Sequence, residues 1–361
     1  MLPFLGEIWG NPSSVHQVGR RARALLDEAR DNAGTLLGCK PSEVVFTSGG
    51  TESANLAVIG TARHLKQQGR HIITTQIEHD AVLRACEFLS RNEGFEVSYL
   101  PVDVEGRVSV ETLQDSIRPD TILVSIMAAN NEIGTIQPIS EIGEICRKRR
   151  VVFHTDAVQW FGKEPVRDIY QFNADLVSIC AHKFHGPKGA GALFIRSPLH
   201  PEPIIMGGGH ENERRAGTEN LAGIVGFVEA LRLFVQTPVF SRNHLTPLTD
   251  RLVESLRSFE SVQLLGSSQH RLANTVAFVV RGADSIALLA NLDLAGICAS
   301  SGSACSAGSL EPSHVVRALG IEDQLQNSLV RFSLGRESTM EEVERVEEIL
   351  PKVISRALQF Q

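Results

Sequence analysis

The sequence has no long hydrophobic run and no strong excess of either charge. No apolar stretch reaches the roughly 20 residues of a membrane-spanning helix, and the first residues lack the pattern of a signal peptide. The net charge is −7, which gives no electrostatic reason for binding to nucleic acid or to an anionic membrane. We therefore expect neither as a direct partner.

Cysteines are few, and they form neither a disulfide-like nor a CxxC pattern. The six are Cys39, Cys86, Cys146, Cys180, Cys298 and Cys305. Scattered cysteines suit a reducing compartment, in which any of them can be a free thiol. We expect a cytoplasmic enzyme or binding protein of 361 residues, long enough for two domains.

Short apolar runs alternate with helical patterns through the first two thirds of the chain. The expected strands are 44–47, 71–75, 96–102, 121–127, 151–155, 175–179 and 192–195. This alternation predicts an α/β fold with a mostly parallel sheet and helices on both faces. Thr237-Pro238 marks a boundary between a large domain, 1–236, and a small domain, 237–361. Within the first domain, 207–211 is a glycine-rich segment that we expect to be flexible.

Polar residues follow several of these strands, where ligands bind in parallel sheets. Gly49-Gly50-Thr51 leads into a helix, and this favours either a phosphate site at the helix N-terminus or an ordinary cap. His79 follows the next strand and is either a ring-stacking imidazole or a helix-start residue. Asn130-Asn131-Glu132 offers amide donors or makes a turn.

Asp156 follows the strand at 151–155, with Gln159 three residues further on. A buried carboxylate there would stabilise a protonated pyridine nitrogen, whereas an exposed one would cap a helix. The residues alone leave both interpretations open.

Lys183 lies in the turn Cys180-Ala181-His182-Lys183-Phe184-His185-Gly186-Pro187-Lys188-Gly189, between two expected strands. A desolvated lysine is a nucleophilic amine that can form a Schiff base, although an exposed turn lysine is the simpler interpretation. Lys188 is the rival amine, but its place between Pro187 and Gly189 should expose it to solvent. A metal site at this turn lacks a fourth ligand, and the segment has no P-loop spacing.

A second informative segment is 299–314, ASSGSACSAGSLEPSH, in which small residues predominate. We expect a mobile loop with Cys305 accessible at its centre, in contrast to Cys86 and Cys146 on helices. An incidental exposed thiol remains the alternative.

Eight segments in order resemble the cysteine desulfurase family of NifS/IscS type, in its branch with a long cysteine loop. They read TSGGTESAN, EHDAV, NNEIG, HTDAVQ, AHKFHGPKG, GGGHE…RAGTEN, SSGSACSAGSLEPSHVVRALG and VRFSLGR, and the resemblance covers nearly the whole chain. It implies a pyridoxal-phosphate (PLP) enzyme of fold type I. Such an enzyme has a mostly parallel seven-stranded sheet and a smaller α+β C-terminal domain.

The resemblance also implies roles for individual residues. Lys183 would hold PLP and move protons on the substrate carbons, while Asp156 would pair with the pyridine nitrogen. Gln159 would contact the ring oxygen, and His79 would stack on the ring and assist proton transfer. Asn131 would lie near cofactor and substrate.

Other residues would hold the phosphate, the substrate and the sulfur. The expected phosphate ligands are Gly50, Thr51, Cys180 and His182, with Thr218 from the partner subunit of a homodimer. Arg331 would bind the carboxylate of L-cysteine. Cys305 would take the sulfur as a persulfide, leaving alanine, and would pass it to an iron–sulfur scaffold or another acceptor. The same thiol is the candidate transient iron–sulfur ligand.

Two features depart from the family pattern. Family members place a serine where Cys180 stands, so weaker cofactor binding is expected. The amino-terminal segment typical of the family is absent before Met1, which raises the alternative of an impaired enzyme or a scaffold. Another fold-type I enzyme, such as a selenocysteine lyase or an aminotransferase, is the other alternative.

Overall fold

The computed structural model describes residues 1–302 and 312–358 and divides into two compact units. The first unit comprises Met1–Leu100, Val110–Ala128 and Pro138–Val239, and the second comprises Pro101–Ser109, Ala129–Gln137 and Phe240–Gln361. The second unit thus begins near the expected boundary but also takes two segments from the first 236 residues. The domain limits 1–236 and 237–361 stay a prediction.

Hydrogen bonds explain why these two segments belong to the second unit. The backbone N–H of Ile136 donates to the carbonyl of His270 at 2.8 Å, and that of Leu272 donates to Gly134 at 3.0 Å. Ser267 Oγ donates to a carboxyl oxygen of Glu105 at 3.0 Å. Both segments are therefore joined to the chain around residues 267–272.

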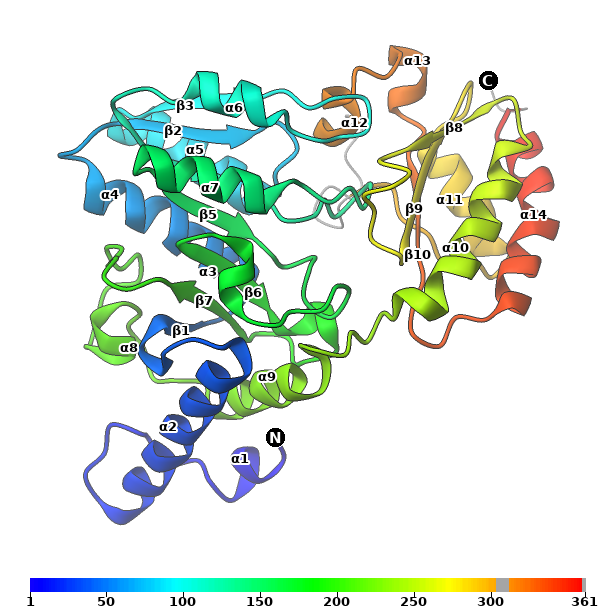
Figure 1. The fold of residues 1–361 in the computed structure, drawn as a ribbon. Coiled ribbons are helices and arrows are strands. Elements are labelled where there is room, and N and C mark those ends of the chain that lie inside the picture. The colour runs from blue at the N-terminus through cyan, green and yellow to red at the C-terminus, as the bar shows by residue number, and fades with distance from the viewer. Residues whose placement is uncertain (303–311, 359–361) are drawn as a thin grey trace. The chain divides into compact units, whose positions relative to one another are not determined.

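The first unit is built on a seven-stranded sheet with helices on both of its faces (Figure 1). Its strands are β1 (Val44–Thr47), β2 (His71–Thr75), β3 (Glu96–Leu100), β4 (Thr121–Ser125), β5 (Val152–Asp156), β6 (Leu176–Cys180) and β7 (Gly191–Ile195). Their order is β1-β7-β6-β5-β4-β2-β3. β2 to β6 run parallel to their neighbours within that group, whereas β7 is antiparallel to both β1 and β6. The predicted α/β class and the mostly parallel sheet are confirmed.

The helices of the first unit follow the predicted alternation. They are α1 (Pro3–Gly6), α2 (Gln17–Leu37), α3 (Gly50–Asn55), α4 (Thr61–Leu65), α5 (Asp80–Glu93), α6 (Val110–Ser116), α7 (Ile139–Arg149), α8 (His210–Glu213) and α9 (Leu221–Phe234). The π-helical segment η2 (Leu56–Gly60) joins α3 to α4, and the 3-10 turns are η1 (Pro41–Glu43), η3 (Ile169–Phe172) and η4 (Ala181–Phe184). α2 and α5 each end at a glycine in the left-handed conformation, Gly38 and Gly94, which suits a helix end.

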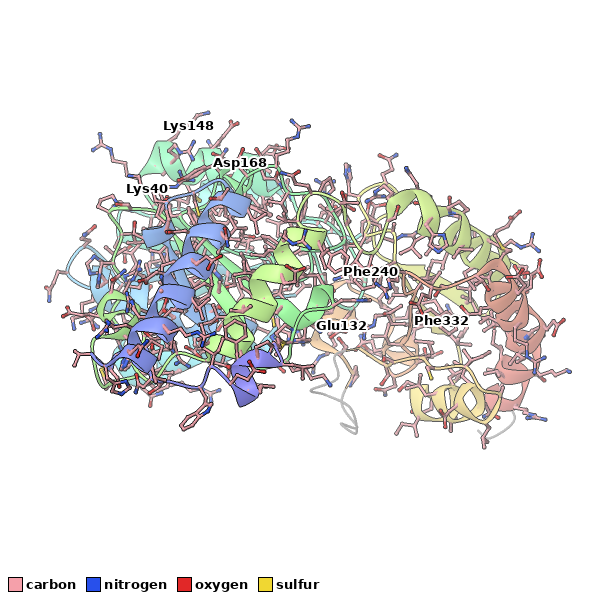
Figure 2. All side chains as sticks on the ribbon, turned by 90° about the horizontal axis from the view of Figure 1, so that it is seen from below. Lys40, Glu132, Lys148, Asp168, Phe240 and Phe332 are labelled. Atoms are coloured by element: carbon pink, nitrogen blue, oxygen red, sulfur yellow. The ribbon has the colours of Figure 1, made fainter. Side chains whose placement is uncertain are left out.

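The second unit has a three-stranded antiparallel sheet in the order β10-β9-β8. The strands are β8 (Val262–Leu265), β9 (Thr275–Val280) and β10 (Val330–Ser333), and the helices are α10 (Arg242–Arg257), α11 (Ser285–Leu294), α12 (His314–Ala318), α13 (Asp323–Gln326) and α14 (Met340–Leu358). Buried apolar residues of the sheet, α10, α11 and α14 form one core, in which the rings of Phe278 and Phe332 lie 5.6 Å apart. Phe332 is labelled in Figure 2. In the part of the chain that is described, no helix has the length and apolar character needed to cross a membrane.

Candidate functional site

Three strands of the first unit end at residues that the sequence singled out. β2 is followed by His79, β5 ends at Asp156, and β6 is followed by Lys183. β5 and β6 are parallel neighbours with Asp156 opposite Ser178, so their carboxyl ends meet at one edge of the sheet. The charges of His79 and Lys183 both act on the carboxyl group of Asp156. The fold therefore brings the three side chains together.

The turn that carries Lys183 is firmly held. Lys183 lies in the 3-10 turn η4, where the N–H of Ala181 donates to Ala190 at 3.1 Å and that of Gly186 donates to Ala181 at 2.9 Å. The ring of Phe184 is buried, with its centroid 6.0 Å from that of Phe161. Lys183 itself is half-buried, so a fixed backbone presents its amine in a partly desolvated place. The rival Lys188 is exposed, as the sequence predicted.

Asp156 is a buried carboxyl group at the last position of β5. Burial raises the pKa of this carboxyl group. Two effects oppose burial: the N–H of Val158, which donates to Oδ1 at 2.9 Å, and the charges of His79 and Lys183. That hydrogen bond orders a turn, so the alternative role of Asp156 as a helix cap is not realised. A buried acid of this kind is well suited to pair with a cationic ligand group.

A small cradle forms where the segment after β1 meets the end of β6. Gly49 has φ of 149°, and a Cβ added at Gly50 would come within 2.8 Å of Cγ2 of Val158, so neither position tolerates a side chain without adjustment. The thiol of Cys180 receives backbone N–H bonds from Gly50 and His182, and its Sγ lies 3.0 Å from Nδ1 of His182. Burial nevertheless raises the pKa of Cys180, which keeps this thiol protonated.

His79 caps a helix. Its Nδ1 accepts the N–H of Ala81 at 3.0 Å at the start of α5, which is the helix-start alternative that the sequence left open. Because Nδ1 accepts this hydrogen bond, Nε2 is the ring nitrogen that can donate one. The cap fixes the orientation of the imidazole, so this role and ring stacking are compatible.

The chain is similar along its whole length to known proteins. The aminotransferase class-V family model matches residues 1–346. Over 356 residues, 47% are identical to a cysteine desulfurase IscS of Methanosarcina thermophila, covering 99% of this chain and 88% of that protein. Another cysteine desulfurase IscS, from Dictyoglomus turgidum, is 45% identical and covers 99% and 90%. The chain belongs to the class V aminotransferase family. A solved NifS-like protein superposes with a TM-score of 0.89 at 36% identity, covering 100% of this chain and 94% of the other.

Class V aminotransferases use PLP and have fold type I, and the residues of the first unit fit that cofactor. The glycine cradle with its backbone N–H groups is suited to a phosphate, and the buried carboxyl group of Asp156 is suited to a pyridinium nitrogen, whose positive charge would favour the ionised acid. Lys183 supplies the amine. Cys180 occupies the cradle with a thiol, a weaker hydrogen-bond donor than a hydroxyl.

Gln159, Thr51 and Thr218 are less fully defined. Oε1 of Gln159 accepts from Nζ of Lys163 at 2.9 Å, so the amide's NH2 group is the end that could serve a ring oxygen. Thr51 and Thr218 are exposed. The segment of Thr218 is joined to α3 through Arg215, whose Nε donates to Glu52 at 2.8 Å. Their expected roles stay predictions.

Arg331 and Asn131 belong to the second unit and lie in contact there. Nη1 of Arg331, on β10, donates a short hydrogen bond to the backbone carbonyl of Asn131. Burial lowers the pKa of Arg331, and the carboxylate of Glu132 acts in the opposite direction. This arrangement leaves a half-buried guanidinium on a fixed strand. Arg331 as substrate ligand and Asn131 beside the cofactor remain predictions.

Cys305, the expected sulfur acceptor and transient iron–sulfur ligand, lies outside the described residues. Across residues 1–302 and 312–358, no group of three or more His, Cys, Asp or Glu side chains could hold a metal ion.

No role was predicted from the sequence for two buried acidic residues that adjoin expected site residues, Glu78 and Glu132. Glu78 stands beside His79, is fully buried, and accepts from Thr75 Oγ1 at 2.8 Å and from the N–H of Met127 at 2.9 Å. Glu132 stands beside Asn131 and is also buried. The available sequence signal for both was their position next to a residue of expected function. Their hydrogen-bond partners Met127 and Ser313 are distant in the sequence and gave no local signal.

Proposed function

We propose that this chain transfers sulfur from L-cysteine to Cys305, releasing L-alanine. The bond between carbon and sulfur in the substrate breaks, a sulfur–sulfur bond forms on Cys305, and protons complete the alanine. The reaction is balanced without an external oxidant or reductant. The family membership and the 45–47% identity to cysteine desulfurases over nearly the whole chain support a PLP-dependent cysteine desulfurase.

The observation that carries the proposal is the pairing of the Lys183 turn with buried Asp156 at neighbouring strand ends. Bound PLP would withdraw electrons from the substrate carbon. Asp156 would keep the pyridine nitrogen protonated, and Lys183 would remove and return the proton at the substrate carbon. His79, oriented by its cap, would assist this transfer, while Gly50, Thr51, Cys180 and His182 would bind the phosphate.

The remaining roles fall on the second unit. The guanidinium of Arg331 would bind the substrate carboxylate through two parallel hydrogen bonds. Asn131 would lie beside cofactor and substrate. Cys305, as a thiolate, would attack the sulfur atom of the substrate and then pass it to a scaffold for iron–sulfur clusters or to another thiolated product.

The test is the visible absorbance of the purified chain, followed by an assay of alanine after addition of L-cysteine. With a small thiol present to take the sulfur from Cys305 after each turnover, we expect a cofactor band that shifts with L-cysteine, and alanine in amounts exceeding the enzyme. Lys183→Ala should abolish both, whereas Lys188→Ala, which changes the exposed lysine of the same turn, should retain both. A bound cofactor with no alanine from cysteine would overturn the proposal. Activity on selenocysteine alone would favour the lyase.

We further propose a cytoplasmic homodimer. Large apolar side chains are exposed along the first 18 residues, namely Leu2, Leu5, Trp9, Val15 and Val18. Apolar surface of this kind is typical of an interface. Sedimentation analysis should give twice the chain mass, and Trp9→Ser with Val15→Ser should shift the equilibrium toward monomer. A wild-type chain that sediments as a monomer would contradict the dimer.

A further inference from the structure

Glu132 is a buried acidic residue at a place where three segments of the second unit meet. The residue is 1% exposed and is labelled in Figure 2. Burying a carboxylate is costly unless hydrogen bonds or a nearby cation compensate. The contacts of Glu132 therefore indicate what this buried charge is for.

Those contacts lie on both sides of the segment that contains Cys305. After that segment, Ser313 Oγ donates to Oε2 of Glu132 at 2.6 Å, and the same Oγ accepts the N–H of Val315 at 3.1 Å. Before it, Gly302 is buried with φ of 84°, and a Cβ there would lie 3.0 Å from Oε2 of Glu132. One carboxylate thus accepts a hydrogen bond from one stem, at Ser313, and fills the space that a side chain would take on the other, at Gly302.

Arg331 is bonded both to the first stem and to the residue before Glu132. The N–H of Ser300 donates to the carbonyl of Arg331 at 3.1 Å, and that of Arg331 donates to Ser300 at 2.7 Å, which fixes the first stem on β10. The guanidinium of Arg331 donates to the carbonyl of Asn131, the residue before Glu132. Residues 131 and 132 therefore hold the expected carboxylate-binding arginine and both stems at once.

We propose that Glu132 is a positioning residue for sulfur transfer, holding the two stems of the Cys305 segment in fixed relation to Arg331. This inference rests on the proposed function, since it assigns the transfer step to Cys305. Glu132 itself need not touch substrate or cofactor. Its loss should leave cysteine binding intact and slow the appearance of sulfur on Cys305.

The test compares Glu132→Ala, Glu132→Gln and Ser313→Ala in the PLP-loaded enzyme. A hydrogen bond to a charged group is strong enough that its loss should slow single-turnover persulfide formation on Cys305 by about tenfold. The spectral Kd for L-cysteine should change by less than about twofold, because Arg331 remains. Glu132→Gln keeps an acceptor oxygen and should retain most of the rate. Ser267→Ala removes a matched Ser–Glu bond, to Glu105, and should react like the wild type.

A second pair of variants does not depend on removing a buried charge. Gly302→Ala places a methyl group against the carboxylate of Glu132, whereas Gly320→Ala has the same kind of positive φ, 67°, and nothing within 4 Å. Both share the backbone strain, so the difference between them reports the contact with Glu132. We expect slower persulfide formation in Gly302→Ala than in Gly320→Ala.

Hydrogen exchange provides a readout independent of activity. The amide of Val315 is protected by Ser313 Oγ, so Glu132→Ala and Ser313→Ala should both speed its exchange, while Ser267→Ala should not. The inference would be overturned if Ser313→Ala formed the persulfide on Cys305 at the wild-type rate and its Val315 amide exchanged at the wild-type rate. It would also be overturned if Ser267→Ala slowed persulfide formation as much as Ser313→Ala does. If Glu132→Ala fails to fold, Ser313→Ala and the glycine pair decide. Alanine production that persists in Cys305→Ala would refute the assigned role of Cys305, while the exchange data would still decide whether Glu132 holds the stems.

Discussion

The fully buried Glu78 makes the stability of the first unit depend on pH. Burial raises its pKa to about 8 from the ordinary 4.5, with Asp156 acting in the same direction and two hydrogen bonds opposing. The folded state therefore favours the neutral acid, whereas the unfolded chain ionises above about pH 4.5. Between these values the unfolded state binds fewer protons, so stability falls as pH rises, by at most about 1.4 kcal/mol per pH unit. From pH 5 to pH 8 this carboxyl alone should remove about 3 kcal/mol.

Glu78→Gln isolates this effect. The amide mimics the neutral acid, and its oxygen can still accept from Thr75 and from the N–H of Met127. We expect the variant to lose less stability than the wild type between pH 5 and pH 8, with a higher urea midpoint at pH 8. Tryptophan fluorescence is the appropriate probe because both tryptophans, Trp9 and Trp160, lie in the first unit.

A control of opposite sign is available in Glu43, another buried acid of the first unit. Burial pushes its pKa upward, but N–H bonds from Ser197 and Lys40 and the hydroxyl of Tyr170 outweigh burial, so its pKa is lowered. Glu43→Gln should therefore destabilise the chain at neutral pH. Equal pH slopes for the wild type and Glu78→Gln would refute the assignment of a neutral Glu78.

Cys180→Ser should bind PLP more tightly by about three- to tenfold, because a hydroxyl donates a stronger hydrogen bond than a thiol. A fluorescence titration measures the Kd for PLP. Cys180→Ala, which has no donor at this position, should show no gain in affinity. Glu211→Ala should cost about 3–5 kcal/mol of unfolding free energy, because it strands Arg30, whose Nη1 donates to Glu211 at 2.8 Å. In the urea assay, Arg30→Ala combined with Glu211→Ala should be more stable than Glu211→Ala alone, and a double variant that is less stable would contradict a stranded charge.

Local sequence patterns predicted the sheet well because short apolar runs bounded by glycine and proline mark buried strands. β8 (Val262–Leu265) carries no such signal, since it is only partly buried and has no continuous apolar run. The segment 207–211 was expected to be flexible, but Glu211 is buried and paired with Arg30. That prediction was wrong at Glu211 because its partner lies 181 residues away.

In the site too, residues with a local sequence signal could be predicted, whereas contacts between distant residues could not. Lys183, Asp156 and His79 were identifiable because each follows a strand, and the parallel order of the strands brings their ends together. The link between Glu132 and Ser313 also spans 181 residues and has no local signal. The cap made by His79 lies within two residues, and it was anticipated as an alternative.

The antiparallel pairing of β6 with β7 has a stereochemical consequence. The two strands pair over their full length, from Leu176 with Ile195 to Cys180 with Gly191, so the Lys183 turn joins two strands bonded to each other. Its main chain cannot shift without the sheet, and only the flexible four-carbon stem of the lysine can move. An amine tethered in this way reaches a bound substrate carbon from one side. A proton taken from that side returns to it, so the alanine released should keep the configuration of the cysteine that entered.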